Sequence, residues 1–265
     1  MPTLKANNVE LYYELEGSGK PLILIPGYAC YGNIWSLIRR ELVGHFKLLV
    51  IDNRDSGRSE SSETAYTIDD MAEDVASLIQ TLGLEKAHIL GHSMGGAIAQ
   101  TLAARHPALV DKLILSNTIV QFSAVSSSIF RWHLSLREKG LPPELVARGI
   151  VPWIFSNEFL SHPNLMESLI ALSIADPYPQ SLASQSRQFD ALTTFNARSL
   201  LKNIAAPTLV IAGEEDICSP PVDSIELARE ILNAQLVTIP KMAHSPVIEC
   251  PEEFTRIVLS FLQTR

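Results

Sequence analysis

The sequence has few cysteines and no long basic or apolar segment, and each absence excludes a class of protein. Its cysteines, Cys30, Cys218 and Cys250, are odd in number and lack C-x-x-C spacing. Such cysteines fit neither a disulfide framework nor a zinc site, so we expect reduced thiols. No basic cluster is longer than Arg39-Arg40 and the net charge is −8, which argues against nucleic acid as a partner. No segment approaches the apolar length needed to cross a bilayer, so no membrane partner is expected.

Signals for export and for several domains are also absent. The first residues, 1–8, lack the basic start and apolar core of a secretory signal, so we expect a cytoplasmic protein. The 265 residues contain no repeat and no low-complexity linker. This length suits one large domain with an insertion or two small domains, and we favour the single domain. Nothing in the sequence indicates an oligomeric state.

The chain does contain short β-type runs that alternate with amphipathic helical segments. This alternation is typical of an α/β protein with a mostly parallel central sheet flanked by helices. The segment Ile68–Leu82 carries apolar residues along one helical face, and Thr67 or Asp69 can cap its start. Several β-type runs are continuously apolar, as strands buried on both faces are. The expected strands are Val9–Leu15, Leu22–Ile25, Lys47–Ile51, Ala87–Leu90, Lys112–Leu115, Thr208–Ala212 and Gln235–Ile239.

Residues 122–188 break this alternation, because they hold no convincing strand and offer helix-like segments punctuated by glycine and proline. We expect this segment to be a helical cap inserted into a core formed by residues 1–121 and 189–265. Its Trp132, Trp153 and Phe155 are candidates for an apolar substrate-binding roof. The alternative is that these aromatic side chains only pack the cap onto the core.

The pentapeptide Gly91-His92-Ser93-Met94-Gly95 follows an apolar run and precedes a stretch of small residues suited to a helix. A strand that turns directly into a helix forces the central residue into a strained backbone conformation, so that its side chain projects above the sheet edge. Ser93 is therefore the candidate nucleophile. The alternative is a glycine-rich turn in which the serine only caps the following helix.

A serine nucleophile needs a base to take its proton and an acid to orient that base. The acidic run Glu214-Glu215-Asp216 follows one late strand, and His244 follows the last strand. Of the 7 histidines, only His244 lies downstream of the acidic run, and it is the expected base. Asp216 is the expected acid, because the chain has to leave the strand end by several positions before a carboxylate can reach the imidazole. No metal site is indicated.

The oxyanion of acyl transfer needs two convergent N–H donors, one from the residue after the nucleophile and one from a loop after an early strand. The first donor is expected to be the backbone N–H of Met94. The second is expected to be that of Tyr28, in the loop Pro26–Cys30 that directly follows an expected strand. Gly27 allows this loop to bend back.

Together these residues resemble the α/β-hydrolase superfamily over almost the full length outside the cap. The resemblance rests on the Ser93 elbow and on three further segments, which resemble the family's D-x-R-x-x-G-x-S turn, its G-x-x-D-x-x-x-P acid loop and its histidine loop. Those segments are Asp52–Ser59, Gly213–Pro220 and Ala243–Pro246. More narrowly, Leu113–Thr118 and Pro207–Gly213 are similar to strands of the small carboxylesterase and 3-oxoadipate enol-lactonase branch.

Two positions depart from the family pattern. Pro26 stands where a histidine usually precedes the glycine of the oxyanion loop, so the side chain that often supports this loop is missing. Asp55 stands where glycine is common in the arginine turn. Its carboxylate is expected either near the pocket mouth or in solvent.

The resemblance implies a cofactor-free serine hydrolase that cleaves a small or medium carboxylic ester or lactone through an acyl-enzyme on Ser93. The expected partner is therefore a small-molecule substrate. Hydrolysis of a carbon–carbon bond in a ring-cleavage product is an alternative within the same chemistry. A further alternative is a receptor that keeps this fold and holds a ligand without turnover, because a fold does not by itself decide function.

Overall fold

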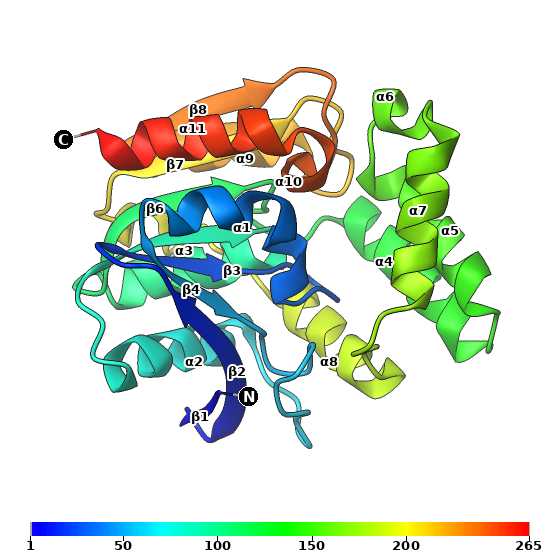
Figure 1. The fold of residues 1–265 in the computed structure, drawn as a ribbon, viewed down its shortest axis with the longest axis horizontal. Coiled ribbons are helices and arrows are strands. Elements are labelled where there is room, and N and C mark those ends of the chain that lie inside the picture. Colours follow the sequence, from blue (N-terminus) through cyan, green and yellow to red (C-terminus); the bar gives the residue numbers. More distant parts are fainter. Residues whose placement is uncertain (1, 265) are drawn as a thin grey trace.

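The computed structural model describes residues 2–264, and an eight-stranded sheet in the order β1-β2-β4-β3-β5-β6-β7-β8 forms its centre (Figure 1). Strand β2 runs antiparallel to both neighbours, whereas every pair from β4 to β8 is parallel. This arrangement confirms the mostly parallel α/β sheet expected from the sequence. The strands are β1 Thr3–Ala6, β2 Val9–Glu16, β3 Pro21–Ile25, β4 Lys47–Ile51, β5 Ala87–His92, β6 Val110–Ser116, β7 Thr208–Gly213 and β8 Ala234–Ile239.

Alternate residues of the strands point to opposite faces of the sheet and build two separate apolar cores. On β3, Ile23 belongs to the core beneath α2 and α3, whereas Leu22 and Leu24 belong to the core beneath α1 and α11. Both faces are therefore covered, which explains why the central strands are almost continuously apolar. The covering helices are α1 Ser36–Val43, α2 Ile68–Thr81, α3 Met94–Arg105, α9 Pro221–Glu230, α10 Pro246–Glu249 and α11 Pro251–Gln263, with short 3-10 turns at Gly32–Trp35 and Leu201–Asn203.

Local capping fixes the start of α2, the helix that the sequence predicted over Ile68–Leu82. The Thr67 hydroxyl accepts a hydrogen bond from the backbone N–H of Asp70, and the Asp70 carboxylate accepts one from the backbone N–H of Thr67. This reciprocal pair satisfies two otherwise unpaired backbone donors. Of the two expected capping residues, the structure thus uses Thr67 and not Asp69.

The chain between β6 and β7 is helical and lies beyond the carboxyl ends of the parallel strands (Figure 1, green to yellow). Part of it has an apolar cluster of its own, built around Val151, Phe155 and Ile170. The last helix, α8, instead packs Phe189 and Leu192 into the main core, so the expected boundary at residue 188 falls within a continuous helix. The division into core and cap remains a prediction. These helices are α4 Ala124–Glu138, α5 Pro143–Ile154, α6 Asn157–Leu160, α7 Pro163–Ile174 and α8 Leu182–Thr193.

Across residues 2–264 no helix combines the length and the apolar character that a membrane crossing requires.

Candidate active site

Ser93 occupies the turn between β5 and α3, with φ 55° and ψ −120°. Such a backbone is strained for a residue with a side chain. The surrounding hydrogen bonds hold it: the Ser93 N–H donates to the Ser116 carbonyl at 2.9 Å, and the Thr118 hydroxyl donates to the Ser93 carbonyl at 2.7 Å. Glycine is needed at the flanking positions, because a Cβ at Gly91 would collide with the Gly95 carbonyl, and one at Gly95 with the Ile25 carbonyl. The turn therefore has the geometry expected of a nucleophile elbow.

The side chain of His244 links the serine to a carboxylate. His244 Nε2 lies 2.9 Å from Ser93 Oγ, and Nδ1 lies 2.8 Å from Asp216 Oδ2. Because an ionised carboxylate only accepts hydrogen bonds, we assign the proton to Nδ1, which leaves Nε2 free to accept from the serine hydroxyl. Asp216 is 2% exposed and His244 6%, so water competes little for these bonds. The structure thus brings Ser93, His244 and Asp216 together in one chain of hydrogen bonds.

Backbone and side-chain donors fix the carboxylate of Asp216. Its Oδ1 accepts from the N–H groups of Cys218 and Ser219, at 2.8 and 2.9 Å. Its Oδ2 accepts from Asn117 Nδ2 at 3.0 Å as well as from His244. Four donors on two oxygens leave the carboxylate little freedom to rotate.

The two acidic neighbours of Asp216 face elsewhere. Glu214 Oε2 accepts from the backbone N–H of Lys241 at 3.1 Å, and Glu215 Oε2 accepts from that of Asn157 at 3.1 Å. Only Asp216 among the three carboxylates is hydrogen-bonded to His244.

Asn117 belongs to this site although the sequence analysis gave it no role. Its side-chain amide donates both to Asp216 Oδ2 and to the Ala243 carbonyl, each at 3.0 Å. It thereby ties the acid loop to the residue before His244. A signal was present, because an asparagine directly after a buried strand suits a left-handed backbone, and Asn117 has φ 47°.

The backbone N–H groups of Tyr28 and Met94, which the sequence predicts as oxyanion donors, have no hydrogen-bond acceptor within residues 2–264. Both residues line the same cavity as Ser93. A pair of unpaired buried amides next to a nucleophile is what stabilisation of an oxyanion requires.

The oxyanion loop is anchored without the histidine that Pro26 replaces. Asn53 Nδ2 donates to the Pro26 carbonyl at 2.9 Å, and the backbone N–H of Ala29 donates to Gln188 Oε1 at 3.0 Å. Further along the loop, the Gly32 N–H donates to Asp52 Oδ1 at 2.8 Å. These three hydrogen bonds hold the loop in the absence of the histidine side chain that often supports it.

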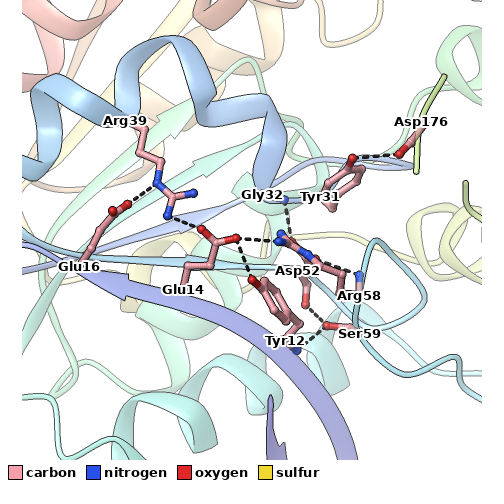
Figure 2. Close-up of polar contacts among 10 residues, drawn as sticks. All are labelled: Tyr12, Glu14, Glu16, Tyr31, Gly32, Arg39, Asp52, Arg58, Ser59 and Asp176. Atoms are coloured by element: carbon pink, nitrogen blue, oxygen red, sulfur yellow. Dashed lines mark hydrogen bonds and ion pairs between the residues drawn. The ribbon is translucent and has the colours of Figure 1, made fainter. Parts of the chain in front are cut away.

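Arg58 stabilises this region from the side of the arginine turn, as Figure 2 shows. Its guanidinium donates to Asp52 Oδ2 at 2.9 Å and to Glu14 Oε1 at 2.7 Å, and it stacks 3.6 Å from the ring centroid of Tyr12. Because Asp52 also holds Gly32, the arginine and the loop after β3 share one carboxylate. The Tyr31 hydroxyl donates to Asp176 at 2.9 Å, which connects the same loop to the cap (Figure 2).

Asp55 lies neither at the pocket mouth nor in solvent, so both expectations for it are wrong. Its side chain is fully buried and forms a two-pronged ion pair with Arg187 of α8, at 2.9 and 2.7 Å. The Ser62 N–H and the Gln180 side-chain amide add hydrogen bonds to Asp55. The residue therefore joins the arginine turn to α8 and takes no direct part in the site.

The cavity at Ser93 is small and mostly apolar. Its volume is about 10 Å³, which is close to the space of one water molecule. Trp132 is 45% exposed, Phe155 is stacked on Phe159 within the cap's own cluster, and Trp153 packs against the main core. None of these three aromatic residues lines the cavity. The lining residues are Tyr28, Ser93, Met94, Ile119, Phe122, Phe130, Leu192, Cys218, Ser219 and His244.

None of the three cysteines forms a disulfide, so all three are free thiols, as expected. The Cys218 thiol donates to the Trp153 carbonyl at 3.1 Å, and burial raises its pKa, so it stays protonated.

His92 packs against the base without bonding to it. The ring centroids of His92 and His244 are 5.1 Å apart. Burial, and to a smaller extent the neighbouring His244, lowers the pKa of His92 well below its usual range. His92 is therefore uncharged at neutral pH and a weaker base than an ordinary imidazole. Within residues 2–264 no group of three or more His, Cys, Asp or Glu side chains is arranged to hold a metal ion.

Comparison with known proteins supports the same family. Residues 20–251 match the family model described as the alpha/beta hydrolase fold. A Caulobacter protein that bears the name "Putative carbamate hydrolase RutD" is 29% identical over 258 residues, which cover 95% of each chain.

Two solved structures extend the comparison. The enol-lactonase from Burkholderia xenovorans superimposes with a TM-score of 0.88 at 26% identity, covering 99% of this chain and all of that one. A thermophilic esterase from Thermogutta terrifontis superimposes with a TM-score of 0.85 at 28% identity, covering 99% of this chain and 98% of that one.

Proposed function

The chain belongs to the α/β-hydrolase family and is a hydrolase, and we propose that it cleaves small, uncharged carboxylic esters or lactones through an acyl-enzyme on Ser93. One observation carries the proposal. The hydrogen-bonded chain Ser93–His244–Asp216 reaches a cavity that is also lined by Tyr28 and Met94, whose backbone N–H groups have no acceptor within residues 2–264. A nucleophile, its base, an orienting acid and oxyanion donors are the parts that acyl transfer requires.

In the proposed first step, Ser93 Oγ attacks the carbonyl carbon of the substrate while His244 Nε2 takes the hydroxyl proton. The carbonyl oxygen becomes an oxyanion, which the N–H groups of Tyr28 and Met94 would bind more strongly than the ground-state carbonyl. Collapse of the tetrahedral intermediate breaks the bond to the alkoxide, and His244 returns the proton to that leaving oxygen. The acyl group stays on Ser93.

In the second step, His244 takes a proton from water, and the resulting hydroxide attacks the acyl carbon. The serine oxygen leaves and regains its proton from His244, so the enzyme returns to its starting state. Asp216 stabilises the imidazolium that forms in each step and keeps Nδ1 protonated. In a lactone the leaving oxygen remains attached to the acyl chain, so the product is a hydroxy acid.

The lining of the cavity supports a short, uncharged acyl group. Apart from His244, the titratable lining side chains are Tyr28 and Cys218, and burial raises the pKa of both, so neither carries a charge at neutral pH. Ile119, Phe122, Phe130 and Leu192 offer apolar surface instead. A carbamate has the same kind of electrophilic carbon, and the name of the Caulobacter relative makes this substrate class the second candidate.

The test measures hydrolysis of p-nitrophenyl butyrate, a p-nitrophenyl carbamate and a small lactone by the wild-type protein and by Ser93→Ala. The proposal expects continuous turnover of an ester or lactone and a loss of about 10³-fold or more in the variant, with unchanged thermal unfolding. Turnover of the carbamate alone would favour the second candidate. A single stoichiometric burst would indicate a receptor, and equal rates for both proteins would exclude Ser93 as the nucleophile.

A further inference from the structure

The carboxylate of Glu249 joins the loop of His244 to the cap. Glu249 ends α10, and its Oε1 accepts from the backbone N–H of Ala243 at 3.2 Å. Its Oε2 accepts from the backbone N–H of Ser156 at 2.9 Å. Ala243 directly precedes His244, whereas Ser156 is a buried residue at the start of α6 in the cap. One side chain therefore contacts the base's loop and the cap at the same time.

The contact with Ala243 bears directly on the base. The Ala243 carbonyl accepts from Asn117, and its N–H donates to Glu249, so side chains hold the two peptide units that flank the Ala243 Cα. The backbone that carries the imidazole of His244 starts at this point. A shift of Ala243 would therefore change the approach of Nε2 to Ser93 Oγ.

The cap contact at α10 is supported by packing. Ile248, next to Glu249, packs against the apolar cluster of Val151, Phe155 and Ile170. The following cap residue, Asn157, donates its N–H to Glu215, the neighbour of Asp216. The start of α6 thus donates hydrogen bonds to one carboxylate from α10 and one from the acid loop.

We expect substrate entry to disturb this junction. The space at Ser93, about 10 Å³, is close to that of one water molecule, so an acyl chain needs more room than this conformation offers, and a shift of the helices above the cavity would provide it. Helix α4, which carries Phe130 over the cavity, is hydrogen-bonded to α5 through His133 Nε2 and the Val146 carbonyl at 3.2 Å. Helix α5 leads directly to Ser156. A movement that opens the cavity therefore pulls on the bond between Ser156 and Glu249.

We infer that Glu249 is a positioning residue that couples closure of the cap over the substrate to the placement of His244 against Ser93. With the cap closed, both oxygens have donors and the carboxylate is fixed. With the cap open, Oε2 loses its donor, the carboxylate can rotate, and its hold on Ala243 weakens. The inference rests on the proposed function, because it assigns a role in bringing His244 to Ser93.

The first test removes the cap's hydrogen-bond donor without touching Glu249. Ser156 has φ −70° and the preceding Phe155 has an extended backbone with ψ 149°, so proline fits at position 156. Ser156→Pro deletes the N–H, but it also loses the hydroxyl that caps α6. Ser156→Ala loses only the hydroxyl and is the matched control.

The second test changes the carboxylate. Glu249→Gln keeps one acceptor oxygen and turns an NH₂ group towards a backbone N–H, so it can satisfy only one of the two donors. Glu252→Gln is the control, because it makes the same change of charge at an exposed position just beyond α10. Thermal unfolding checks that each variant is folded.

The expected result is a fall in kcat on the order of tenfold for Ser156→Pro relative to Ser156→Ala, and for Glu249→Gln relative to Glu252→Gln. This lies within the roughly 100-fold that a misplacement of about 1 Å can cost. The pH profile of kcat should change as well. The double variant that combines Ser156→Pro with Glu249→Gln should be no slower than Glu249→Gln alone, because both changes break the same hydrogen bond. Unchanged kcat and pH profiles, or an effect on KM alone, would overturn the inference. Those outcomes are expected if Glu249 only holds the cap in place and does not affect His244.

A probe that needs no ester turnover separates this inference from the proposed function. A fluorophosphonate labels an activated serine, and intact mass spectrometry follows the labelling rate of Ser93. If the wild-type protein reacts with the probe but hydrolyses no ester, lactone or carbamate, the proposed function fails while the labelling rates still test Glu249. Equal rates for Ser156→Pro and Ser156→Ala, and for Glu249→Gln and Glu252→Gln, would overturn the coupling.

Discussion

The side-chain amide of Asn117 and the imidazole of His244 share one oxygen of Asp216, at 3.0 and 2.8 Å. The same amide nitrogen also donates to the Ala243 carbonyl. Asn117 therefore fixes the position of Asp216 relative to the backbone that precedes His244.

Replacing Asn117 by alanine should lower kcat by about 10- to 100-fold with little change in KM. The reason is that the Asp216 carboxylate and the Ala243 carbonyl would both lose a buried donor, which costs roughly 1–3 kcal/mol for each such group. Steady-state kinetics with a p-nitrophenyl ester measure the effect. Asn233→Ala, at an exposed asparagine bonded to a carbonyl at 3.4 Å, is the matched control. Equal kcat values for the two variants would show that Asn117 does not orient the acid.

Phe130→Ala should extend the range of acyl chains that the protein accepts, because Phe130 lines the small cavity at Ser93. The expected change is about tenfold in relative kcat/KM between butyrate and octanoate esters, since contacts of one or a few methylenes are worth roughly 1–3 kcal/mol. Trp132→Ala, on the same helix but 45% exposed, should leave the ratio unchanged. If Trp132→Ala changed the ratio and Phe130→Ala did not, Trp132 and not Phe130 would contact the acyl chain.

Arg187→Ala should destabilise the fold by about 3–5 kcal/mol, because it leaves the fully buried Asp55 carboxylate without its partner. The control is Arg148→Ala, which removes an equally two-pronged pair with Glu167 on the exposed surface of the cap. Exposed pairs contribute about 0–1 kcal/mol. Urea unfolding of both variants gives the comparison, and similar losses would mean that the Asp55 pair is no stronger than a surface pair.

The wild-type fold should lose stability as the pH falls from about 6.5 to about 4, and His88 should account for part of the loss. Burial lowers the pKa of His88 from 6.5 to about 4. In this window the unfolded chain binds a proton that the folded chain does not, so stability rises with pH and is lost on acidification. Asp223, whose pKa is raised by burial from 3.8 to about 6, acts in the opposite direction.

The variant His88→Gln isolates the contribution of His88. Between pH 7 and pH 5 it should lose about 2 kcal/mol less stability than the wild-type protein, from linkage between pKa values of 6.5 and about 4. Chemical unfolding at the two pH values measures this difference. His162→Gln, at an exposed histidine, should behave like the wild type. Parallel losses in all three proteins would place the acid sensitivity elsewhere.

Much of the sheet could be predicted because strands that are buried on both faces have continuously apolar sequences. Lys47–Ile51 agrees at both ends, and the other expected strands agree to within a few residues. Strand β1, Thr3–Ala6, was missed because it is a four-residue edge strand that lacks such a run. Its existence depends on pairing with β2, which a local pattern does not reveal.

The candidate site could be predicted where chain order and local turns define it, as for Ser93, Asp216 and His244. Contacts between segments that are distant in the chain could not be predicted from the sequence. The role of Asn117 depends on two loops that converge far along the chain, and the surroundings of Asp55 depend on Arg187 in another helix. The cap aromatics were judged by residue type, whereas exposure and packing keep Trp132 away from the cavity.

The left-handed backbone of Ser93 sets stability and activity against each other at one position. Glycine adopts φ 55° without the penalty of roughly 1–2 kcal/mol that a side chain incurs there. A Ser93→Gly protein should therefore unfold at a higher temperature than the wild type while having no nucleophile. Any selection scheme that scores only thermal resistance or expression level would enrich for this inactive protein, so directed evolution of this chain needs an activity screen at every round.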